Sequence, residues 1–475
     1  MSWLLGAIMG GAASSAWEFG DEVESKLQRR EWWWKQFKAK RRADEGAAMG
    51  HVSAFRAAVT EDVGEKATLA KHALAKTKML RHPNILSCAD VVESEKDIVI
   101  ITEAVVALPD WLQQQRAAGT SQEQLDAVVV WGVRCILDAL CFLHSQGLVH
   151  GLLCPESIFV TKAGDFKLWG LDLASNLTLA ADQAYFRQHE RCLATLSGGP
   201  QFRSPERSEG EWEKHDKHFG AADGWALGHT IPSMFIDEPT AELGKVCKRL
   251  SVSNPLARPK LGRVLEADCF TGHPYTVAML FVAELSLKDH SELVVFFKAL
   301  VPALPTMPTA TRVYKLLPAL HSGITRSLAP DKRPEQCREM VAACLPILGD
   351  IGSSMSGEEY REHVLPAVLP LFGVKDRAVR MLLLDRVEAL VKHMDAQTVN
   401  GLVFEQLNAG FSDTAKELRE LTLKSMLSLV EKLNDVNLND KLMRTLAKLQ
   451  QDPEASIRTN TTIFYGKVRV ETRTA

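Results

Sequence analysis

The sequence predicts an α+β domain with two lobes, followed by an all-α solenoid of repeated helix pairs. Three observations lead to this fold class. Strand-like segments gather in the first third of the chain, and helical patterns dominate after them. Beyond Asp268 the strand pattern stops, and several apolar positions near the C-terminus recur every 39 residues. With 475 residues, the chain is long enough for two or three domains with separate cores.

The first lobe is expected to be a small sheet with one helix beside it. Residues 52–59 and 97–102 are dense in apolar and β-branched side chains and predict strands, while residues 66–80 predict a helix. The second lobe begins with a strongly periodic helix at 127–145. Two short strands are then expected on either side of the turn at 162–165. This order of elements fits a small β lobe followed by a helical lobe.

Composition argues against several classes of protein. Hydrophobic residues make up 46 % of the chain and charged residues 24 %, which is typical of a globular protein. The net charge of −3 argues against a dedicated nucleic-acid binder. The nine cysteines include no C-x-x-C pair, so we expect reduced thiols without a disulfide framework or a zinc site. No run of about 18 apolar residues occurs, and we therefore expect no transmembrane helix.

Residues 1–44 are interpreted as an N-terminal arm. Residues 3–16 are apolar but carry no Lys or Arg and are followed by acidic residues, which does not fit a signal peptide. Residues 24–46 are highly charged and contain three consecutive tryptophans that end at Trp34. Such a run is usually an exposed loop or helix end, which is the interpretation we favour. The alternative is an aromatic and basic contact with a membrane surface.

A repeat of about 40 residues organises the C-terminal part, which we assign to residues 275–475. An offset of 39 residues links sets of three positions: Val379, Leu418 and Ile457; Leu365, Phe404 and Met443; Val368, Leu407 and Leu446; Val387, Met426 and Tyr465. Such a period, with two helices per unit, is the signature of HEAT repeats. Each unit buries its apolar face on its neighbours, so we expect Leu382, Leu390, Leu421 and Leu429 in the core.

An arginine follows the first of these repeated positions in every unit, namely Arg380, Arg419 and Arg458. These arginines start the second helix of each unit, where a cation gains nothing from the helix dipole. We therefore expect a carboxylate in the turn to hold them: Asp413 for Arg419 and Asp452 for Arg458. This predicts a structural ladder, which we favour over a row of ligand-binding residues.

Six fragments occur in the order in which protein kinases carry their motifs. They resemble the segment after the regulatory helix, the catalytic loop, the metal-binding DFG motif, the APE motif, the D-x-W-x-x-G motif and a late arginine. Their positions are 81–86, 150–160, 167–172, 202–206, 223–228 and 258–259. The domain at about residues 45–270 therefore resembles a bilobal protein kinase.

The residues that phosphoryl transfer needs are replaced. Transfer requires a Lys on the phosphates, a Glu that holds this Lys, an Asp base, and Asp and Asn ligands for magnesium. The corresponding positions are Phe55 for the phosphate Lys, Ala73 for its Glu, Leu152 for the base, Cys154 for the loop Lys, and Ser157 and Gly170 for the metal ligands. A leucine cannot accept a proton, and a glycine has no side chain to bind a metal. We therefore predict a non-enzymatic kinase-like domain without cofactor or metal.

The motif residues that are retained are structural ones: His150, Pro155, Glu206, Asp223, Trp225 and Arg258. Because Glu206 and Arg258 both survive although the catalytic residues do not, we expect them to form an ion pair inside the second lobe. Asp172 follows the DFG position, and we expect it to serve a turn or a cap rather than to restore metal binding. His144 and His150 are likewise expected to pack rather than to bind a metal.

A degenerate kinase-like domain joined to HEAT repeats resembles the Scy-like pseudokinase family, also called N-terminal kinase-like proteins. The resemblance covers about residues 45–468 and is carried by the motifs above and by the segments 102–105, 376–380, 437–440 and 458–462. It implies a non-catalytic scaffold in vesicle traffic between the Golgi and the endoplasmic reticulum. Coat or other trafficking proteins would bind through the solenoid, and the location would be cytoplasmic with peripheral membrane contact at the Golgi. Trafficking members carry a basic coat-binding tail, which Arg473 alone does not match.

Two alternatives stay open at this point. Relatives in the resembled family are implicated in exporting tRNA from the nucleus, so the chain could be a tRNA-linked adaptor, which requires a basic stripe along the repeats. The other alternative is a protein kinase with weak residual ATP binding.

Overall fold

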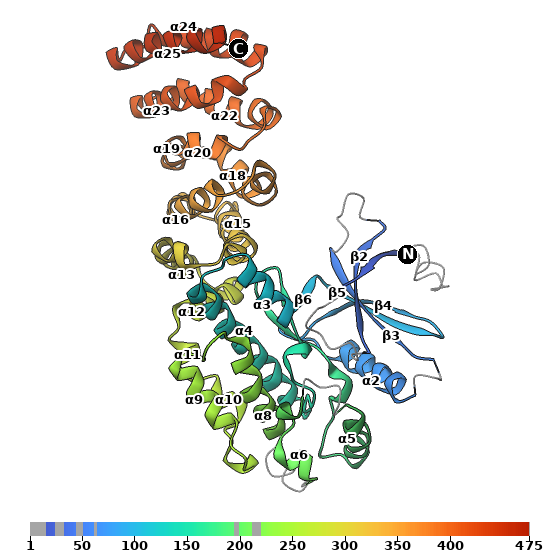
Figure 1. The fold of residues 1–475 in the computed structure, drawn as a ribbon. Helices are drawn as coiled ribbons and strands as arrows, with labels where there is room; N and C mark the ends of the chain where they lie inside the picture. Colours follow the sequence, from blue (N-terminus) through green and yellow to red (C-terminus); the bar gives the residue numbers. More distant parts are fainter. Residues whose placement is uncertain are drawn as a thin grey trace. The chain divides into compact units, whose positions relative to one another are not determined.

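The computed structural model describes residues 16–23, 33–43, 51–60, 64–193, 199–210 and 220–474. The chain divides into two compact units, Met1–Leu280 and Phe281–Ala475. The boundary therefore falls after residue 280, rather than between residues 270 and 275 as the sequence suggested. Both lobes of the kinase-like domain lie in the first unit, and the regular elements described in the second unit are all helical (Figure 1).

A five-stranded antiparallel sheet forms the first lobe, in the order β1-β2-β3-β5-β4. Its strands are β1 (Trp17–Glu22), β2 (Lys35–Arg41), β3 (Val52–Ala58), β4 (Cys88–Glu93) and β5 (Asp97–Glu103). Helix α2 (Glu65–Met79) contacts β3 and β5. The expected elements β3, α2 and β5 are confirmed to within one residue at each end.

The described part of residues 1–44 is not an arm, because β1 and β2 belong to this sheet. β2 pairs with β3 in register from Lys35 to Ala39. The period of a strand explains the basic run, since Phe37 and Ala39 are buried and Lys38 between them is exposed. Nearly all of the apolar segment 3–16 lies outside the described residues.

The second lobe combines a three-stranded sheet with helices. Its strands, in the order β6-β7-β8, are β6 (Val105–Ala107), β7 (Ile158–Thr161) and β8 (Phe166–Leu168). Its α-helices are α3 (Leu108–Ala117), α4 (Gln122–Ser145), α5 (Ala180–Leu193), α6 (Pro205–Glu209), α8 (Ala221–Thr230), α9 (Ala241–Leu250), α10 (Leu261–Val264) and α11 (Asp268–Thr271). Its short 3-10 segments are η3 (Pro155–Ser157), η4 (Leu171–Leu173), η5 (Pro200–Phe202), η6 (Ile231–Met234) and η7 (Pro255–Ala257).

Helix α4 is the central helix of this lobe. It begins at Gln122, earlier than expected, because the hydroxyl of Ser121 accepts a hydrogen bond from the backbone N–H of Gln124 and caps the helix. By length and composition α4 could cross a membrane, which corrects the expectation that the chain holds no such segment. However, 67 % of the apolar stretch of α4 is buried inside the domain, as in the core helix of a globular fold.

The second unit is a stack of helices, shown from yellow to red in Figure 1. Its α-helices are α13 (His290–Leu300), α14 (Thr309–Thr311), α15 (Leu317–Ser327), α16 (Pro334–Ser353), α17 (Gly357–Glu359), α18 (Leu365–Phe372), α19 (Arg377–Leu384), α20 (Val387–Val391), α21 (Ala396–Thr398), α22 (Phe404–Asn408), α23 (Lys416–Met426), α24 (Met443–Leu449) and α25 (Ala455–Thr474); α12 (Pro274–Ala283) spans the boundary. Tighter or wider turns continue these helices at η8 (Leu285–Leu287), η9 (Val301–Thr306), η10 (Arg312–Leu316), η11 (Tyr360–Val364), η12 (Val399–Val403), η13 (Ala409–Ser412), η14 (Leu427–Lys432) and η15 (Val436–Leu442).

The last three helix pairs follow the predicted repeat. Each pairs a first helix with a second: η11–α18 with α19–α20, η12–α22 with α23–η14, and η15–α24 with α25. The repeated positions Val379, Leu418 and Ile457 are each 0 % exposed, so the 39-residue period marks the core of the stack.

Two of the four leucines expected in the core are not fully buried. Leu390 and Leu429 are buried, whereas Leu382 and Leu421 are only half-buried. The buried face of α23 runs through positions four residues apart, beginning at Leu418, and this face passes beside Leu421.

Candidate functional site

Four aromatic side chains fill the space between the two lobes, where a kinase would hold its nucleotide. Phe55 in β3, which the sequence assigns to the position of the phosphate Lys, is 1 % exposed. Its ring centroid lies 5.1 Å from that of Phe159 in β7 and 4.7 Å from that of Trp169, which follows β8. Trp34, just before β2, makes an edge contact with Trp169 at 5.7 Å. We call Trp34, Phe55, Phe159 and Trp169 the cleft cluster.

Other catalytic positions belong to the same apolar core. Ala73 in α2, at the position of the Lys-binding Glu, is buried, and so is Leu152 at the position of the Asp base. Both side chains belong to the hydrophobic core that contains the cleft cluster. The ring contacts within the cleft cluster contribute about 0.5–1.5 kcal/mol each, in addition to the effect of the area they bury. The substituted positions of the two lobes have thus become one packed core.

Asp172 is the polar centre of this core. Its Oδ1 accepts hydrogen bonds from the indole N–H groups of Trp33 at 3.0 Å and Trp34 at 2.9 Å. The side chain is 0 % exposed, and its burial raises the pKa of the carboxyl to about 7, although the two indole hydrogen bonds oppose the rise. The hydroxyl of Tyr185 donates to the backbone oxygen of Asp172 at 2.9 Å.

These contacts correct two expectations. Asp172 does not serve a simple turn or cap, because its carboxylate binds two side chains that precede β2 in the other lobe. The tryptophan run is not an exposed surface either, since Trp33 and Trp34 are 9 % and 2 % exposed. Transfer of these rings from water into the apolar space between the lobes lowers their free energy. Trp32 lies outside the described residues.

The remaining catalytic positions serve local packing. The hydroxyl of Ser157 donates to the carbonyl of Cys154 at 2.8 Å and accepts from its N–H at 3.1 Å, which closes the short η3 turn that begins at Pro155. Burial raises the pKa of the Cys154 thiol, so the thiol stays protonated. Gly170 has φ +84°, a left-handed conformation that suits glycine.

The backbone between the lobes is also occupied. Val105 begins β6, where the chain passes from the first sheet to the second. Its N–H donates to the hydroxyl of Ser53 at 3.2 Å, and its carbonyl accepts from the side-chain amide of Gln36 at 2.8 Å. The adenine ring of a nucleotide in the cleft could not bond to these two backbone groups, because both are already paired.

Asp223 ties the loop around His150 to α8. Its carboxylate accepts the backbone N–H groups of His150 at 2.8 Å and Gly151 at 2.9 Å, and the Nε2–H of His144 at 2.9 Å. His150 in turn donates from Nε2 to the carbonyl of Trp169 at 3.0 Å. Burial alone would raise the pKa of Asp223, but the hydrogen bond from His144 and the electrostatic interaction with its ring outweigh burial and lower the pKa.

Both histidines therefore pack and donate hydrogen bonds. Among the residues that the structure describes, no group of three or more His, Cys, Asp or Glu side chains could hold a metal ion.

The ion pair between Glu206 and Arg258 is present, as predicted. Arg258 donates two hydrogen bonds to the Glu206 carboxylate at 2.7 and 2.9 Å, and the two side chains are 0 % and 1 % exposed. The guanidinium also lies over the ring of Trp225 at 5.0 Å. A buried bidentate pair of this kind fixes α6, which carries Glu206, to the end of the lobe.

The arginines of the repeats are held differently from the prediction. The carboxylate partner of Arg419 is Asp452 of the following unit, at 2.8 and 3.0 Å, and not Asp413. Arg419 reaches Asp413 only through its backbone carbonyl at 2.9 Å, and Arg458 bonds the carbonyl of Asp452 at 2.7 Å. Arg380 donates to the carbonyl of Gln406 at 2.9 Å. The carboxylates of Asp413 and Asp452 also accept the backbone N–H groups of Ala415 and Glu454, just before α23 and α25 begin.

A ladder nevertheless runs along the turns, between neighbouring units. Its rungs join an arginine of one unit to the aspartate that precedes the second helix of the next, and they are Arg338–Asp376, Arg377–Asp413 and Arg419–Asp452. Reasoning from the sequence missed Arg338, Arg377 and Asp376, although the spacing of the aspartates was available as a signal.

Comparison with known proteins agrees with this architecture. Residues 47–253 match the protein kinase domain family. The "Probable inactive serine/threonine-protein kinase scy1" of Dictyostelium discoideum is 28 % identical over 417 residues, which cover 85 % of this chain and 48 % of that protein. The chain is a homologue of the SCY1-like proteins. The mouse "Protein-associating with the carboxyl-terminal domain of ezrin" is also 28 % identical, over 78 % of this chain and 49 % of its own length.

The chain spans about half the length of the curated relatives that it matches. Among solved structures, that of Cex1p superposes with a TM-score of 0.66 and 22 % identity, and the match covers 95 % of this chain and 80 % of that one. At this identity the likeness establishes the fold, a kinase domain followed by a helical region.

Proposed function

We propose that the kinase-like domain transfers no phosphate and that the chain acts as a protein-binding scaffold. The observation that carries the first part is the cleft cluster. Phe55 occupies the place of the phosphate Lys, and its ring contacts rings from the opposite lobe. A nucleotide could enter only by displacing these buried rings.

The chemistry of the site supports the same proposal. Phosphoryl transfer depends on positioning and on charge neutralisation by a lysine and bound metal ions. Leu152 cannot act as a base, and Gly170 offers no ligand. Asp172, two residues after Gly170, is already bound by Trp33 and Trp34. The name of the Dictyostelium relative, a probable inactive kinase, agrees with this view.

Thermal melting with nucleotide tests the first part. A ligand that does not bind the native state cannot raise its melting temperature. We expect millimolar ATP, with or without magnesium, to leave the melting temperature of the full chain unchanged, while an active protein kinase in parallel is stabilised. A magnesium-dependent rise would favour the alternative of a residual kinase.

The helical unit is the proposed site of partner binding. Stacked helix pairs present extended surfaces that suit protein recognition. The mouse relative is named for association with another protein, which supports protein partners for this chain. We place the scaffold in the cytoplasm, in vesicle traffic at the Golgi, as the family resemblance implies.

Quantitative recovery of bound proteins tests this second part. The full chain would be compared with a chain that ends at Leu280, the boundary between the two units. We expect the shortened chain to lose the proteins that the full chain recovers. Equal recovery by the first unit alone would move partner binding to the kinase-like domain. Recovery that disappears after ribonuclease treatment would instead favour the tRNA-linked adaptor.

A further inference from the structure

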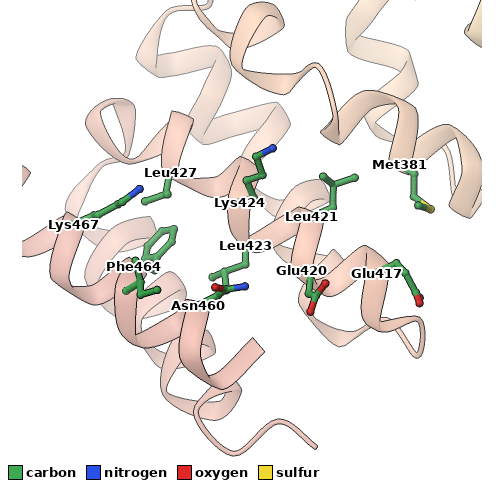
Figure 2. Close-up of a pocket in the computed structure, with 11 residues that line it drawn as sticks. Met381, Glu417, Glu420, Leu421, Leu423, Lys424, Leu427, Asn460, Phe464 and Lys467 are labelled. Atoms are coloured by element: carbon green, nitrogen blue, oxygen red, sulfur yellow. The ribbon is translucent and has the colours of Figure 1, made fainter. Parts of the chain in front are cut away.

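A groove of about 530 Å³ lies on the solenoid between the second helices α19, α23 and α25 (Figure 2). Its apolar part is contributed by all three helices, through Met381, Leu421 and Ile463. Met381 is 40 % exposed and Ile463 is 53 % exposed, although the cores of their helices are well packed. Apolar side chains that gather in a depression, rather than singly on the surface, mark a binding surface.

Charged side chains divide the groove into two ends. Glu417 and Glu420 stand in the first turns of α23, whereas Lys424 stands in its last turn. Lys467 of α25 lies at the same end as Lys424, because α25 runs alongside α23 with Ser456 bonded to Glu420 at the other end. Figure 2 shows the two lysines on one side of the groove and the two glutamates on the other.

Three of these charges are available to a partner. Glu417, Lys424 and Lys467 are exposed. Within the described parts of the chain, none of the three forms an ion pair.

We propose that this groove binds a short amphipathic α-helix of a partner protein, which runs antiparallel to α23. The proposal deepens the scaffold function and rests on it. The partner helix would place apolar residues, three or four positions apart, on Met381, Leu421 and Ile463. Its acidic N-terminal end would meet the lysines, and its basic C-terminal end would meet the glutamates.

The orientation follows from the helix dipole. Acidic residues stabilise a helix at its N-terminus and basic residues at its C-terminus. A helix with this favourable arrangement matches the charges of the groove only when it runs against α23. The length also fits, because the groove follows α23 from Glu417 to Leu427, which at 1.5 Å per residue is about 15 Å or nearly three turns.

A helix fits this groove better than the other common ligands. An extended peptide binds by adding a strand to a free sheet edge, but this groove is walled by helices whose backbone groups are already paired. A nucleic acid would bring its phosphates against Glu417 and Glu420, which repel them.

Peptide binding to the full chain tests the proposal. The probe is a fluorescent peptide of about eleven residues with Asp and Glu at its N-terminal end, leucines spaced by three and four positions, and Lys and Arg at its C-terminal end. The control peptide carries Gln in place of every charged residue. We expect the probe to bind at least about tenfold more tightly than the control peptide in fluorescence anisotropy.

Substitutions identify the site. Ile463→Asp should weaken binding of the probe by about tenfold or more. The matched control is Leu402→Asp, because Leu402 lies in η12 outside the groove and is 58 % exposed, close to the value for Ile463. The double change Lys424→Glu and Lys467→Glu makes both ends of the groove acidic and should abolish the preference for the probe. All these positions are exposed, so unchanged melting temperatures should show that the variants fold.

The proposal is overturned if both peptides bind equally, or if Ile463→Asp and Leu402→Asp have the same effect. In that case the scaffold function still stands, provided that the full chain recovers proteins that a chain ending at Leu280 does not. If the shortened chain recovers them equally, the scaffold role of the solenoid fails independently of the groove.

Discussion

The indole N–H of Trp34 donates a hydrogen bond to Oδ1 of Asp172 at 2.9 Å, across the space between the two lobes. Trp34 precedes β2 in the first lobe, and Asp172 lies in η4 of the second. Two residues before Asp172, Gly170 occupies the place of a kinase's metal ligand. This hydrogen bond therefore joins the two lobes from within the space between them.

Asp172→Asn should stabilise the protein at neutral and alkaline pH but not at acid pH. The carboxyl has an ordinary pKa of 3.8 and a pKa of about 7 in the fold, because burial disfavours its charge. As pH rises from about 4 to 7, the unfolded chain loses this proton first, so the free energy of unfolding falls. Asparagine carries no such penalty, and its advantage above pH 7 should be up to about 4 kcal/mol.

Melting curves of both proteins between pH 4 and pH 8 check this prediction. Asp165→Asn is a suitable control, because Asp165 accepts the indole N–H of Trp131 at 2.9 Å but is only half-buried and lies outside the cleft. A difference between Asp172→Asn and the natural chain that stays constant with pH would contradict the prediction.

Phe55→Ala should destabilise the first unit by about 3–5 kcal/mol, because it removes a fully buried ring and leaves a cavity in the cleft cluster. Phe55→Leu retains most of the volume and should lower the free energy of unfolding by less.

Phe55→Lys should restore no ATP binding, since the ammonium would be buried among Trp34, Phe159 and Trp169. Denaturant unfolding followed by tryptophan fluorescence measures the first two effects, and melting with ATP measures the third. Stabilisation of Phe55→Lys by magnesium ATP would show that the cleft can reopen.

Glu206→Ala should cost about 3–5 kcal/mol, because it leaves the charge of Arg258 buried without a carboxylate. The backbone carbonyls of Val252, Ser253 and Ala221 would still accept from Arg258, but they do not neutralise it. As a control, Glu93→Ala breaks the exposed pair with Lys78 and should cost less than about 1 kcal/mol. Equal losses of stability for the two variants would mean that burial of the pair carries little weight.

Arg419→Ala should destabilise the helical unit more than Arg338→Ala. Both changes remove a rung of the same ladder, but the Arg419 side chain is 12 % exposed and the Arg338 side chain is 44 % exposed. We expect about 1–3 kcal/mol for the first and less than about 1 kcal/mol for the second. Hydrogen exchange in α23 and α25 localises the effect of Arg419→Ala, and protection lost equally in both variants would argue against the difference.

The local elements could be predicted because their signals lie within a few residues. The run of β-branched residues at 97–102 formed β5, and the helix expected at 66–80 formed α2. The 39-residue period placed Val379, Leu418 and Ile457 in the core, because each unit repeats the same packing problem. The pairing of Glu206 with Arg258 was available from the kinase motifs.

The partners of polar and aromatic groups could not be predicted in the same way. The run ending at Trp34 was expected at the surface. No residue near it in the sequence indicates that its rings pack between the two lobes. Arg419 was assigned to the aspartate of its own unit, whereas the stacking of successive units brings Asp452 closer to its guanidinium.

The sequence by itself therefore determined the order of the elements and the repeat period, because these depend on residue type and local spacing. Only the tertiary structure decided what fills the space between the lobes, which carboxylate Arg419 binds, and where Met381, Leu421 and Ile463 form a groove. These features join residues that are distant along the chain, and they follow from the geometry with which sheets, lobes and helix pairs pack on one another.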